Sequence, residues 1–150
     1  MDGTHLALVF TMREKMESHV YDRLREMKIL LIDDDELIRD SLTLFFWGKG
    51  VPLSSFETAE KGLEDLDKND YDIIIVDYRL PGMDGVEFFK HIQEKQKKTL
   101  NILITAYKDQ KVVSEAKKVG IQDIIEKPFT SKTIEQTLSF RIVEHGKNFS

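Results

Sequence analysis

Five short apolar runs recur along most of the chain, and stretches with helical periodicity separate them. The runs cover residues 28–32, 52–56, 73–76, 100–104 and 121–125. The run at 73–76 shows no polar alternation, which is typical of a strand buried on both faces in a parallel sheet. The second run begins with Pro52, which cannot donate a hydrogen bond to a neighbouring strand, so we place it near the edge of the sheet.

Apolar residues at helical spacing follow each of these runs and indicate five helices. Thr58, Asp84 and Asp109 stand where the N-caps of the second, third and fourth helices are expected. The alternation of strands and helices predicts right-handed crossovers and an α/β domain whose parallel sheet is covered on both faces. The inner face of the first helix is predicted to carry Leu37, Ile38, Leu42, Phe45 and Phe46.

Residues 1–27 stand apart from this pattern. An apolar face recurs at helical spacing from Thr11 onward, with charged residues between its members Met12, Met16, Val20, Leu24 and Met27. We favour a partly helical extension that carries no chemistry. An accessory or dimerising helix and a flexible leader are the alternatives. The domain itself is expected over residues 28–145, and a polar tail over residues 146–150.

Composition narrows the class of protein. A length of 150 residues fits one domain with a real core. The net charge of -5 argues against direct contact with nucleic acid. The absence of cysteine excludes disulfides and thiolate metal sites and suits a cytoplasmic location. No apolar stretch approaches the roughly 20 residues that a membrane span requires, so no membrane contact is expected.

Polar side chains follow the predicted strands at their carboxyl ends, where open α/β sheets place their ligand sites. The carboxyl ends of parallel strands lie along one edge, so residues far apart in the sequence meet there. Helix capping accounts for one acidic residue after the first strand, but several adjacent ones repel each other and favour a bound cation. The residues that converge on this edge are Asp33, Asp34, Asp77, Thr105 and Lys127.

Carboxylates, a hydroxyl and an ammonium together indicate phosphoryl chemistry. Carboxylate oxygens suit a hard cation such as Mg²⁺. An aspartate such as Asp77 can attack a phosphoryl group and form an acyl phosphate. A metal ion and Lys127 would spread the charge on the transferring phosphoryl oxygens, and Thr105 can donate a hydrogen bond to one of them. No glycine-rich phosphate loop is present, so a bound nucleotide is not indicated.

The chain resembles the receiver domain of two-component response regulators over about residues 28–145. This resemblance implies a flavodoxin-like, doubly wound (βα)5 fold with a five-stranded parallel sheet of order 2-1-3-4-5. It also implies a phosphorylation-dependent signalling switch that catalyses only its own aspartyl phosphorylation and slow dephosphorylation. The motifs that carry the resemblance are Asp33-Asp34, the segment Asp77 to Gly85, Thr105-Ala106 and Lys127-Pro128.

The resemblance assigns roles around the metal. Asp77 would accept a phosphoryl group from a sensor histidine kinase or a histidine phosphotransfer protein. Asp34, Asp77 and the backbone carbonyl of Arg79 would hold Mg²⁺, and Asp33 would act mainly through a metal-bound water.

The resemblance also assigns the response to phosphorylation. Lys127 would pair with Asp77 before phosphorylation and with the phosphoryl oxygens after it. Thr105 would swing toward the phosphoryl group and relay the change to the face formed by the fourth helix, fifth strand and fifth helix of the domain. The Lys127-Pro128 peptide bond is expected to be cis.

Three positions are expected to modulate the switch. Ile124 stands three residues before Lys127, where the family usually carries an aromatic residue, so the output signal is expected to be weaker or carried differently. Arg79 and Tyr107 would flank the path of an attacking water, which predicts slow self-dephosphorylation.

The output and two other functions stay open. The chain would act through a downstream protein partner or through an effector domain that this sequence lacks, and a homodimer is one of its open oligomeric states. A phosphatase of the haloacid dehalogenase type is an alternative, because Asp33-x-Asp35 mimics its nucleophile and acid, although Leu37 stands where that family has Thr or Val. A receiver-like interaction module that never receives phosphate is a further alternative.

Overall fold

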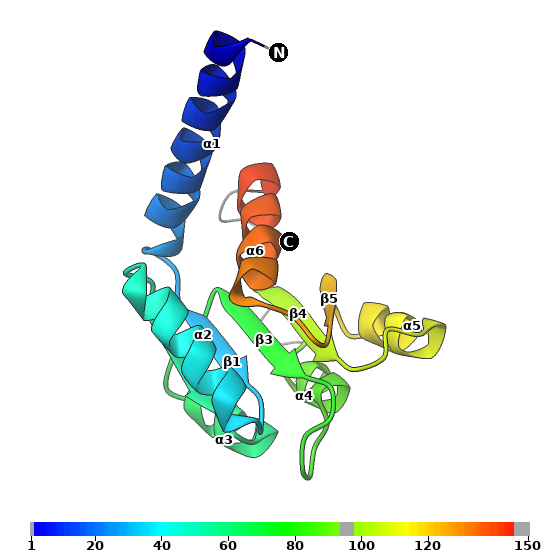
Figure 1. Ribbon diagram of the computed structural model, residues 1–150. Helices are drawn as coiled ribbons and strands as arrows, with labels where there is room; N and C mark the ends of the chain where they lie inside the picture. Colours follow the sequence, from blue (N-terminus) through cyan, green and yellow to red (C-terminus); the bar gives the residue numbers. More distant parts are fainter. Residues whose placement is uncertain (1, 94–97, 146–150) are drawn as a thin grey trace.

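Five parallel strands form one sheet in the order β2-β1-β3-β4-β5. The computed structural model describes residues 2–93 and 98–145, so the predicted tail at 146–150 lies outside the described residues. Figure 1 shows the sheet between two layers of helices. The strands are β1 (Ile29–Ile32), β2 (Leu53–Phe56), β3 (Ile73–Asp77), β4 (Leu100–Thr105) and β5 (Asp123–Glu126). The helices are α1 (Gly3–Leu24), α2 (Glu36–Gly48), α3 (Ala59–Leu66), α4 (Gly85–Ile92), α5 (Gln110–Lys118) and α6 (Ser131–His145).

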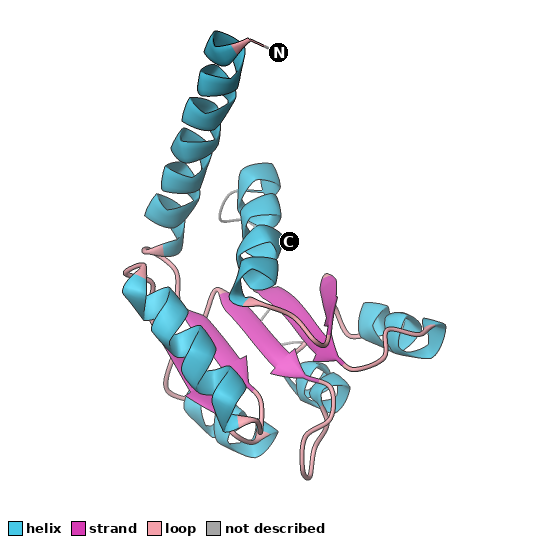
Figure 2. Ribbon diagram, viewed as in Figure 1, coloured by secondary structure: helices cyan, strands magenta, loops and turns pink. Residues whose placement is uncertain are grey.

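This arrangement confirms the predicted doubly wound fold, its strand order and the N-terminal helix. Strands and helices alternate from β1 to α6, and every pair of neighbouring strands is parallel (Figure 2). All strand carboxyl ends therefore lie along one edge of the sheet. The edge position of β2 agrees with the placement of Pro52 just before it.

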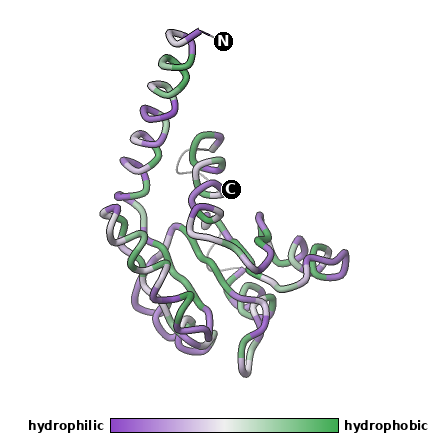
Figure 3. Tube along the Cα trace, in the orientation of Figure 1, coloured by the Kyte–Doolittle hydropathy of each residue, from purple (hydrophilic) through white to green (hydrophobic). Residues whose placement is uncertain are grey.

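The sheet supplies two hydrophobic cores, one on each face. Ile29 and Leu31 of β1 pack in the core under α2 and α6, whereas Leu30 and Ile32 pack in the core under α3, α4 and α5. Successive strand residues point to opposite faces, so only a strand that is apolar at every position can serve both cores. Figure 3 shows the central strands as hydrophobic along their length.

The helix starts agree with the predicted caps. Thr58, Asp84 and Asp109 each accept a backbone N–H from the first turn of the helix that follows, and Asp35 does the same for α2. Such caps satisfy backbone donors that have no partner within the helix.

The prediction that Leu37 faces the core is wrong. Its side chain is 73% exposed, whereas Leu42 and Phe46 are buried. Each helical residue is rotated by about 100° from the one before it. Leu37 therefore lies well off the face that carries the buried residues, and it is left at the surface near the carboxyl edge of the sheet.

Helix α1 is longer than the periodicity from Thr11 suggested, because it begins at Gly3. Its last turns join the domain. Val20 and Leu24 are buried in the core under α2 and α6, and the Tyr21 hydroxyl donates a hydrogen bond to the Glu135 carboxylate of α6. The rest of α1 extends away from the sheet (Figure 1). Within the described ranges, no helix is both long and apolar enough to cross a bilayer.

Candidate functional site

Asp33 lies directly after β1 and is fully buried. Its backbone N–H continues the sheet by donating to the Phe56 carbonyl at 3.1 Å. Its Oδ1 accepts the backbone N–H of Asp35 at 2.9 Å. Its Oδ2 forms an ion pair with the Lys127 ammonium at 3.5 Å but accepts no hydrogen bond from any described residue. A buried carboxylate oxygen without a donor is costly, which makes it a strong acceptor for a ligand.

Asp77 is the last residue of β3 and is 5% exposed, whereas Asp34 is exposed at the mouth of the site. One carboxylate oxygen from each of Asp33, Asp34 and Asp77 lies within 4.8 Å of the other two. Hard cations prefer oxygen ligands such as these carboxylates, and Mg²⁺ typically takes one or two carboxylates and several waters. The residues present therefore fit Mg²⁺, and the open Oδ2 of Asp33 is the atom that such a hydrated ion would satisfy.

Lys127 brings a positive charge to these carboxylates from the far side of β4. Its Nζ lies 3.2 Å from Asp77 Oδ2, to which it donates a hydrogen bond, and 3.5 Å from Asp33 Oδ2. Its backbone N–H donates to the Thr105 carbonyl at 2.8 Å, which ties the ends of β4 and β5 together. The Lys127-Pro128 peptide bond is cis.

Burial and crowding set the protonation of this cluster. Burial, reinforced by the charge of Asp33 and opposed by Lys127, raises the pKa of Asp77 to about 6. Burial likewise raises the pKa of Asp33. Burial by itself lowers the pKa of Lys127, but the charges of Asp33 and Asp77 outweigh it and raise that pKa above its ordinary value. The site holds more negative charge than Lys127 alone balances.

Thr105 ends β4 on the same edge and is buried. Its hydroxyl interacts with its own loop, since it lies 3.2 Å from both the backbone N and the carbonyl of Tyr107. The Tyr107 side chain is 71% exposed, and the Arg79 side chain is also exposed. Ile124 is half-buried against the core under α3, α4 and α5. The structure thus gathers the three carboxylates and Lys127, while Thr105 bonds elsewhere.

Gly85 is a positioning residue that the sequence analysis missed. A Cβ at this position would lie 2.5 Å from the Asp77 carbonyl oxygen and 2.9 Å from Cδ1 of Leu103. Its backbone N–H donates to the Tyr78 carbonyl at 2.9 Å. Only glycine lets α4 begin this close to the end of β3. The Asp84-Gly85 pair in the sequence is the signal that could have indicated this.

The loop between β3 and α4 is also braced from outside. Gly82 has a φ of +79°, which favours glycine, and the Met83 N–H donates to a carboxylate oxygen of Glu60 at 3.0 Å. This contact joins the loop to the first turn of α3. The loop after Asp77 is therefore held by α3 at Met83 and by the start of α4 at Tyr78.

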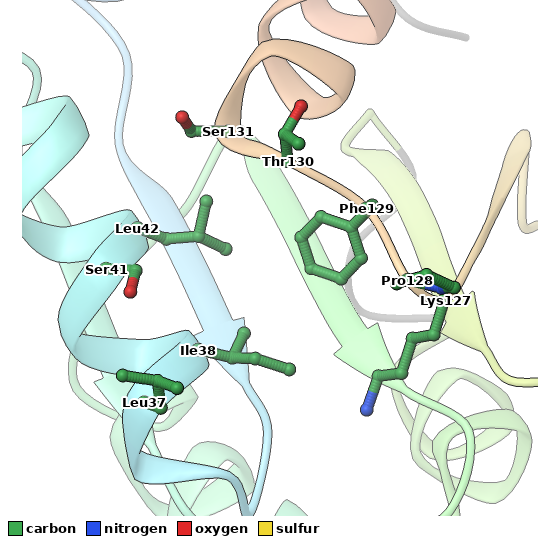
Figure 4. Close-up of a pocket in the computed structure, with 9 residues that line it drawn as sticks. All are labelled: Leu37, Ile38, Ser41, Leu42, Lys127, Pro128, Phe129, Thr130 and Ser131. Carbon is green, nitrogen blue, oxygen red and sulfur yellow. The ribbon is translucent and has the colours of Figure 1, made fainter.

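An apolar cleft of about 650 Å³ adjoins the site. It lies between the start of α2 and the segment that joins β5 to α6. Figure 4 shows Ile38 and Leu42 facing Phe129 across it, with the Lys127 ammonium at its lower end. The exposed Leu37 also lines it. The sequence analysis missed this cleft, because it placed Leu37 in the core.

Asp35 does not support the phosphatase alternative. Its Oδ1 accepts the Leu37 N–H at 2.9 Å as the cap of α2. The residue that would serve as the acid of a haloacid dehalogenase pair is thus engaged in starting a helix.

Comparison with known proteins agrees with this geometry. The family described as "Response regulator receiver domain" matches residues 29–139. The transcriptional regulatory protein FixJ of Bradyrhizobium diazoefficiens is 34% identical over 101 residues, which cover 67% of this chain and 49% of FixJ. The chemotaxis protein CheY-3 of Vibrio cholerae is 31% identical over 119 residues, which cover 76% of this chain and 90% of CheY-3. The chain thus spans about half the length of FixJ and most of CheY-3.

Solved structures show the same likeness. The chemotaxis response regulator CheY4 of Vibrio cholerae superposes with a TM-score of 0.72 at 28% identity, covering 76% of this chain and 97% of CheY4. The BeF3-activated DrrB receiver domain superposes with a TM-score of 0.70 at 26% identity, covering 79% of this chain and 98% of that domain. With the family matched over most of its length and the carboxylates and lysine on one sheet edge, the chain belongs to the receiver domain family of two-component response regulators.

Proposed function

We propose that Asp77 is the phosphoacceptor of this receiver domain. The observation that carries the proposal is the position of its carboxylate, which is at the end of β3, within hydrogen-bond distance of Lys127 and among two further carboxylates. Receiver domains bind Mg²⁺ at such an acidic pocket. Here Asp34, Asp77 and the backbone carbonyl of Arg79 would hold the ion, and Asp33 would contact it through water. When bound, Mg²⁺ supplies positive charge to the oxygens of the transferring phosphoryl group.

The reaction is a transfer between two side chains. A carboxylate oxygen of Asp77 attacks the phosphorus of a phosphohistidine on the partner, the N–P bond breaks, and its electron pair stays on the imidazole nitrogen, which then takes up a proton. The product is an acyl phosphate on Asp77. The Lys127 ammonium, 3.2 Å from Asp77 Oδ2, is close enough to move from the carboxylate to a phosphoryl oxygen.

Thr105 supplies the response. Among the residues that the structure describes, its hydroxyl bonds only with the Tyr107 backbone, and these are neutral hydrogen bonds of 3.2 Å. A phosphoryl oxygen carries charge and accepts a hydrogen bond more strongly than a neutral carbonyl does. Phosphorylation would therefore draw the hydroxyl toward Asp77 and move this loop. The change would reach the face formed by α5, β5 and α6, where Ile124 stands instead of an aromatic residue.

The apolar cleft beside Lys127 supports a protein as phosphodonor. Exposed Leu37 and the ring of Phe129 offer apolar contact area next to the acidic site, and a docked helix could bring its phosphohistidine to Asp77. A sensor histidine kinase or a histidine phosphotransfer protein fits this description. For output, a downstream protein or an effector domain would bind the face formed by α5, β5 and α6 differently after phosphorylation. The domain would act as a switch whose chemistry is limited to its own phosphorylation and slow dephosphorylation.

Labelling with a small phosphodonor tests the proposal. With Mg²⁺ and phosphoramidate, intact-mass measurement should show about one phosphoryl group per chain. Asp77→Asn should abolish it, and Asp70→Asn, at an exposed position, should not. Labelling that survives in Asp77→Asn but disappears in Asp33→Asn would point to the phosphatase chemistry instead. Repeated turnover of the donor would point the same way, and absence of labelling with Mg²⁺ bound would point to an interaction module.

A further inference from the structure

Helix α1 leaves a large apolar surface uncovered, and α6 beside it exposes further apolar side chains. Eight of the twelve large hydrophobic side chains that are exposed among the described residues belong to these two helices. Receiver chemistry on the carboxyl edge of the sheet uses none of them. They are Leu6, Leu8, Val9, Phe10, Met12 and Met16 on α1, and Phe140 and Val143 on α6.

The two helices form a groove of about 730 Å³. At its base Val20 and Tyr21 pack against α6, and Glu135 accepts the hydrogen bond from Tyr21. Further along, Val9 and Met16 line one wall and Val143 lines the other. Helix α1 runs toward the base whereas α6 runs away from it, so the pair is antiparallel, and the N-terminal half of α1 continues past α6 (Figure 1).

The free half of α1 has the composition of a buried helix. Leu6, Leu8, Val9 and Phe10 are rotated from one another around the axis, so apolar side chains cover more than half of its circumference. They are 45–58% exposed. A helix that is apolar on several sides is stable in water only when another surface covers it.

We propose that a second copy of this chain covers it, with the free half of each α1 seated antiparallel in the α1–α6 groove of the other copy. A two-fold axis across the two α1 helices brings Leu6 of each copy near Met16 of the other. Both the groove and the helix that fills it are then supplied by the same sequence, as an isologous contact requires. The result is a bundle of two α1 and two α6 helices, built on the side of the domain away from the acidic site.

The exposed area is sufficient for such a dimer. An aromatic side chain buries about 150–250 Å², and Leu, Val and Met bury less, so a half-exposed side chain of this set offers on the order of 70–100 Å². The eight side chains together offer roughly 600–800 Å² per copy, close to the approximately 800 Å² per partner of a standard stable interface. The groove charges are mixed, with Arg13 and Lys132 beside Glu17 and Glu135, so two copies do not repel through a net charge there.

Sedimentation equilibrium of the full chain at micromolar concentrations tests the proposal. The wild type should have twice the 17.5 kDa mass of one chain. Val9→Glu and Met16→Glu should each weaken dimerisation by roughly 30-fold or more, since they place a charge in the centre of the contact. Leu44→Glu is the matched control, because Leu44 is 75% exposed on α2. A single cooperative thermal transition in each variant would show that the domain itself folds, even where loss of the partner lowers the thermal midpoint.

Single cysteines test the antiparallel geometry, since the chain has none of its own. A mixture of Leu6→Cys and Met16→Cys should form the mixed disulfide dimer in preference to either symmetric one. A monomeric wild type overturns the proposal, including one that instead binds phospholipid vesicles through α1. Dimers that persist in both glutamate variants, or Leu6→Cys chains that pair with each other, overturn it as well. None of these outcomes depends on phosphorylation of Asp77.

Discussion

The ammonium of Lys127 lies 3.2 Å from a carboxylate oxygen of Asp77, although their strands are not neighbours. β4 lies between β3 and β5, so the lysine reaches across the end of β4 to make this contact. The backbone of Lys127 is fixed at the end of β4, because its N–H donates a hydrogen bond to the Thr105 carbonyl. One lysine thus connects three strand ends, and the charge balance of the site depends on it.

Replacing that lysine should slow phosphorylation. Lys127→Ala removes the cation that would stabilise the transferring phosphoryl oxygens, and loss of one such group typically costs about 10²–10³ in rate. The initial rate of labelling by phosphoramidate at saturating Mg²⁺ measures the effect. Lys111→Ala, which removes an exposed lysine on α5, should leave the rate unchanged. Equal labelling rates in the two variants would mean that Lys127 does not take part in the phosphoryl transfer.

The raised pKa of Asp77 predicts a pH-dependent stability. Its pKa is about 6 in the fold, against 3.8 ordinarily, so the folded state holds the proton more tightly than the unfolded chain does. This contribution is fully present below pH 3.8 and is lost as the pH rises through about 6. In the absence of metal, Asp77→Asn should therefore be more stable than the wild type at pH 7, by about 1–3 kcal/mol. The difference should shrink toward pH 4.

Urea unfolding in the presence of a chelator, repeated from pH 4 to 7, measures this difference. Asp70→Asn, at an exposed position, should show no comparable gain in stability at pH 7. A difference between Asp77→Asn and the wild type that does not vary with pH would mean that Asp77 is not the group that titrates.

Self-dephosphorylation should be slow in the wild type and faster when the side chains at the mouth are shortened. Tyr107→Ala and Arg79→Ala open the path of an in-line water, and each should speed the decay of the acyl phosphate by roughly threefold or more. Decay is followed by intact mass after the phosphodonor is removed. If neither substitution changes the decay, these side chains do not gate water.

Gly85→Ala should destabilise the domain, because its Cβ would lie 2.5 Å from the Asp77 carbonyl oxygen, which belongs to a central strand and cannot withdraw easily. Overpacking of this kind costs about 1–3 kcal/mol. Gly48→Ala is the matched control, since its Cβ would meet no atom within 4 Å and its φ is not positive. Urea denaturation of both variants compares them directly. An equal loss of unfolding free energy in the two variants would show that small shifts of the neighbouring atoms relieve the crowding at Gly85.

Local patterns predicted most of the fold. The uninterrupted apolar runs indicated strands buried on both faces, and the caps at Thr58, Asp84 and Asp109 are confirmed. The convergence of Asp33 and Asp77 followed from a topological rule, since parallel strands end on one edge. These are properties that a few neighbouring residues determine.

What the sequence could not indicate depends on distant residues. Leu37 lies at the surface because its angular position around α2 is away from the buried face. Counting apolar residues along the sequence does not fix that angle. The hydrogen bond from Tyr21 to Glu135 joins residues 114 positions apart. The crowding at Gly85 depends on Leu103 of another strand. Each of these features exists only once the tertiary structure brings the partners together.

The attachment of α1 to α6 has a mechanical consequence. Among the described residues, those of α1 that are buried against the domain lie in its last turns, at Val20, Tyr21 and Leu24. The 22 residues of α1 extend over about 33 Å. α6 in turn begins four residues after Lys127. If α1 follows a tilt of α6 by about 5°, its length displaces the Gly3 end by roughly 3 Å. A small change in the direction of α6 would therefore become a larger displacement at the Gly3 end of α1, on the side of the domain away from the acidic site.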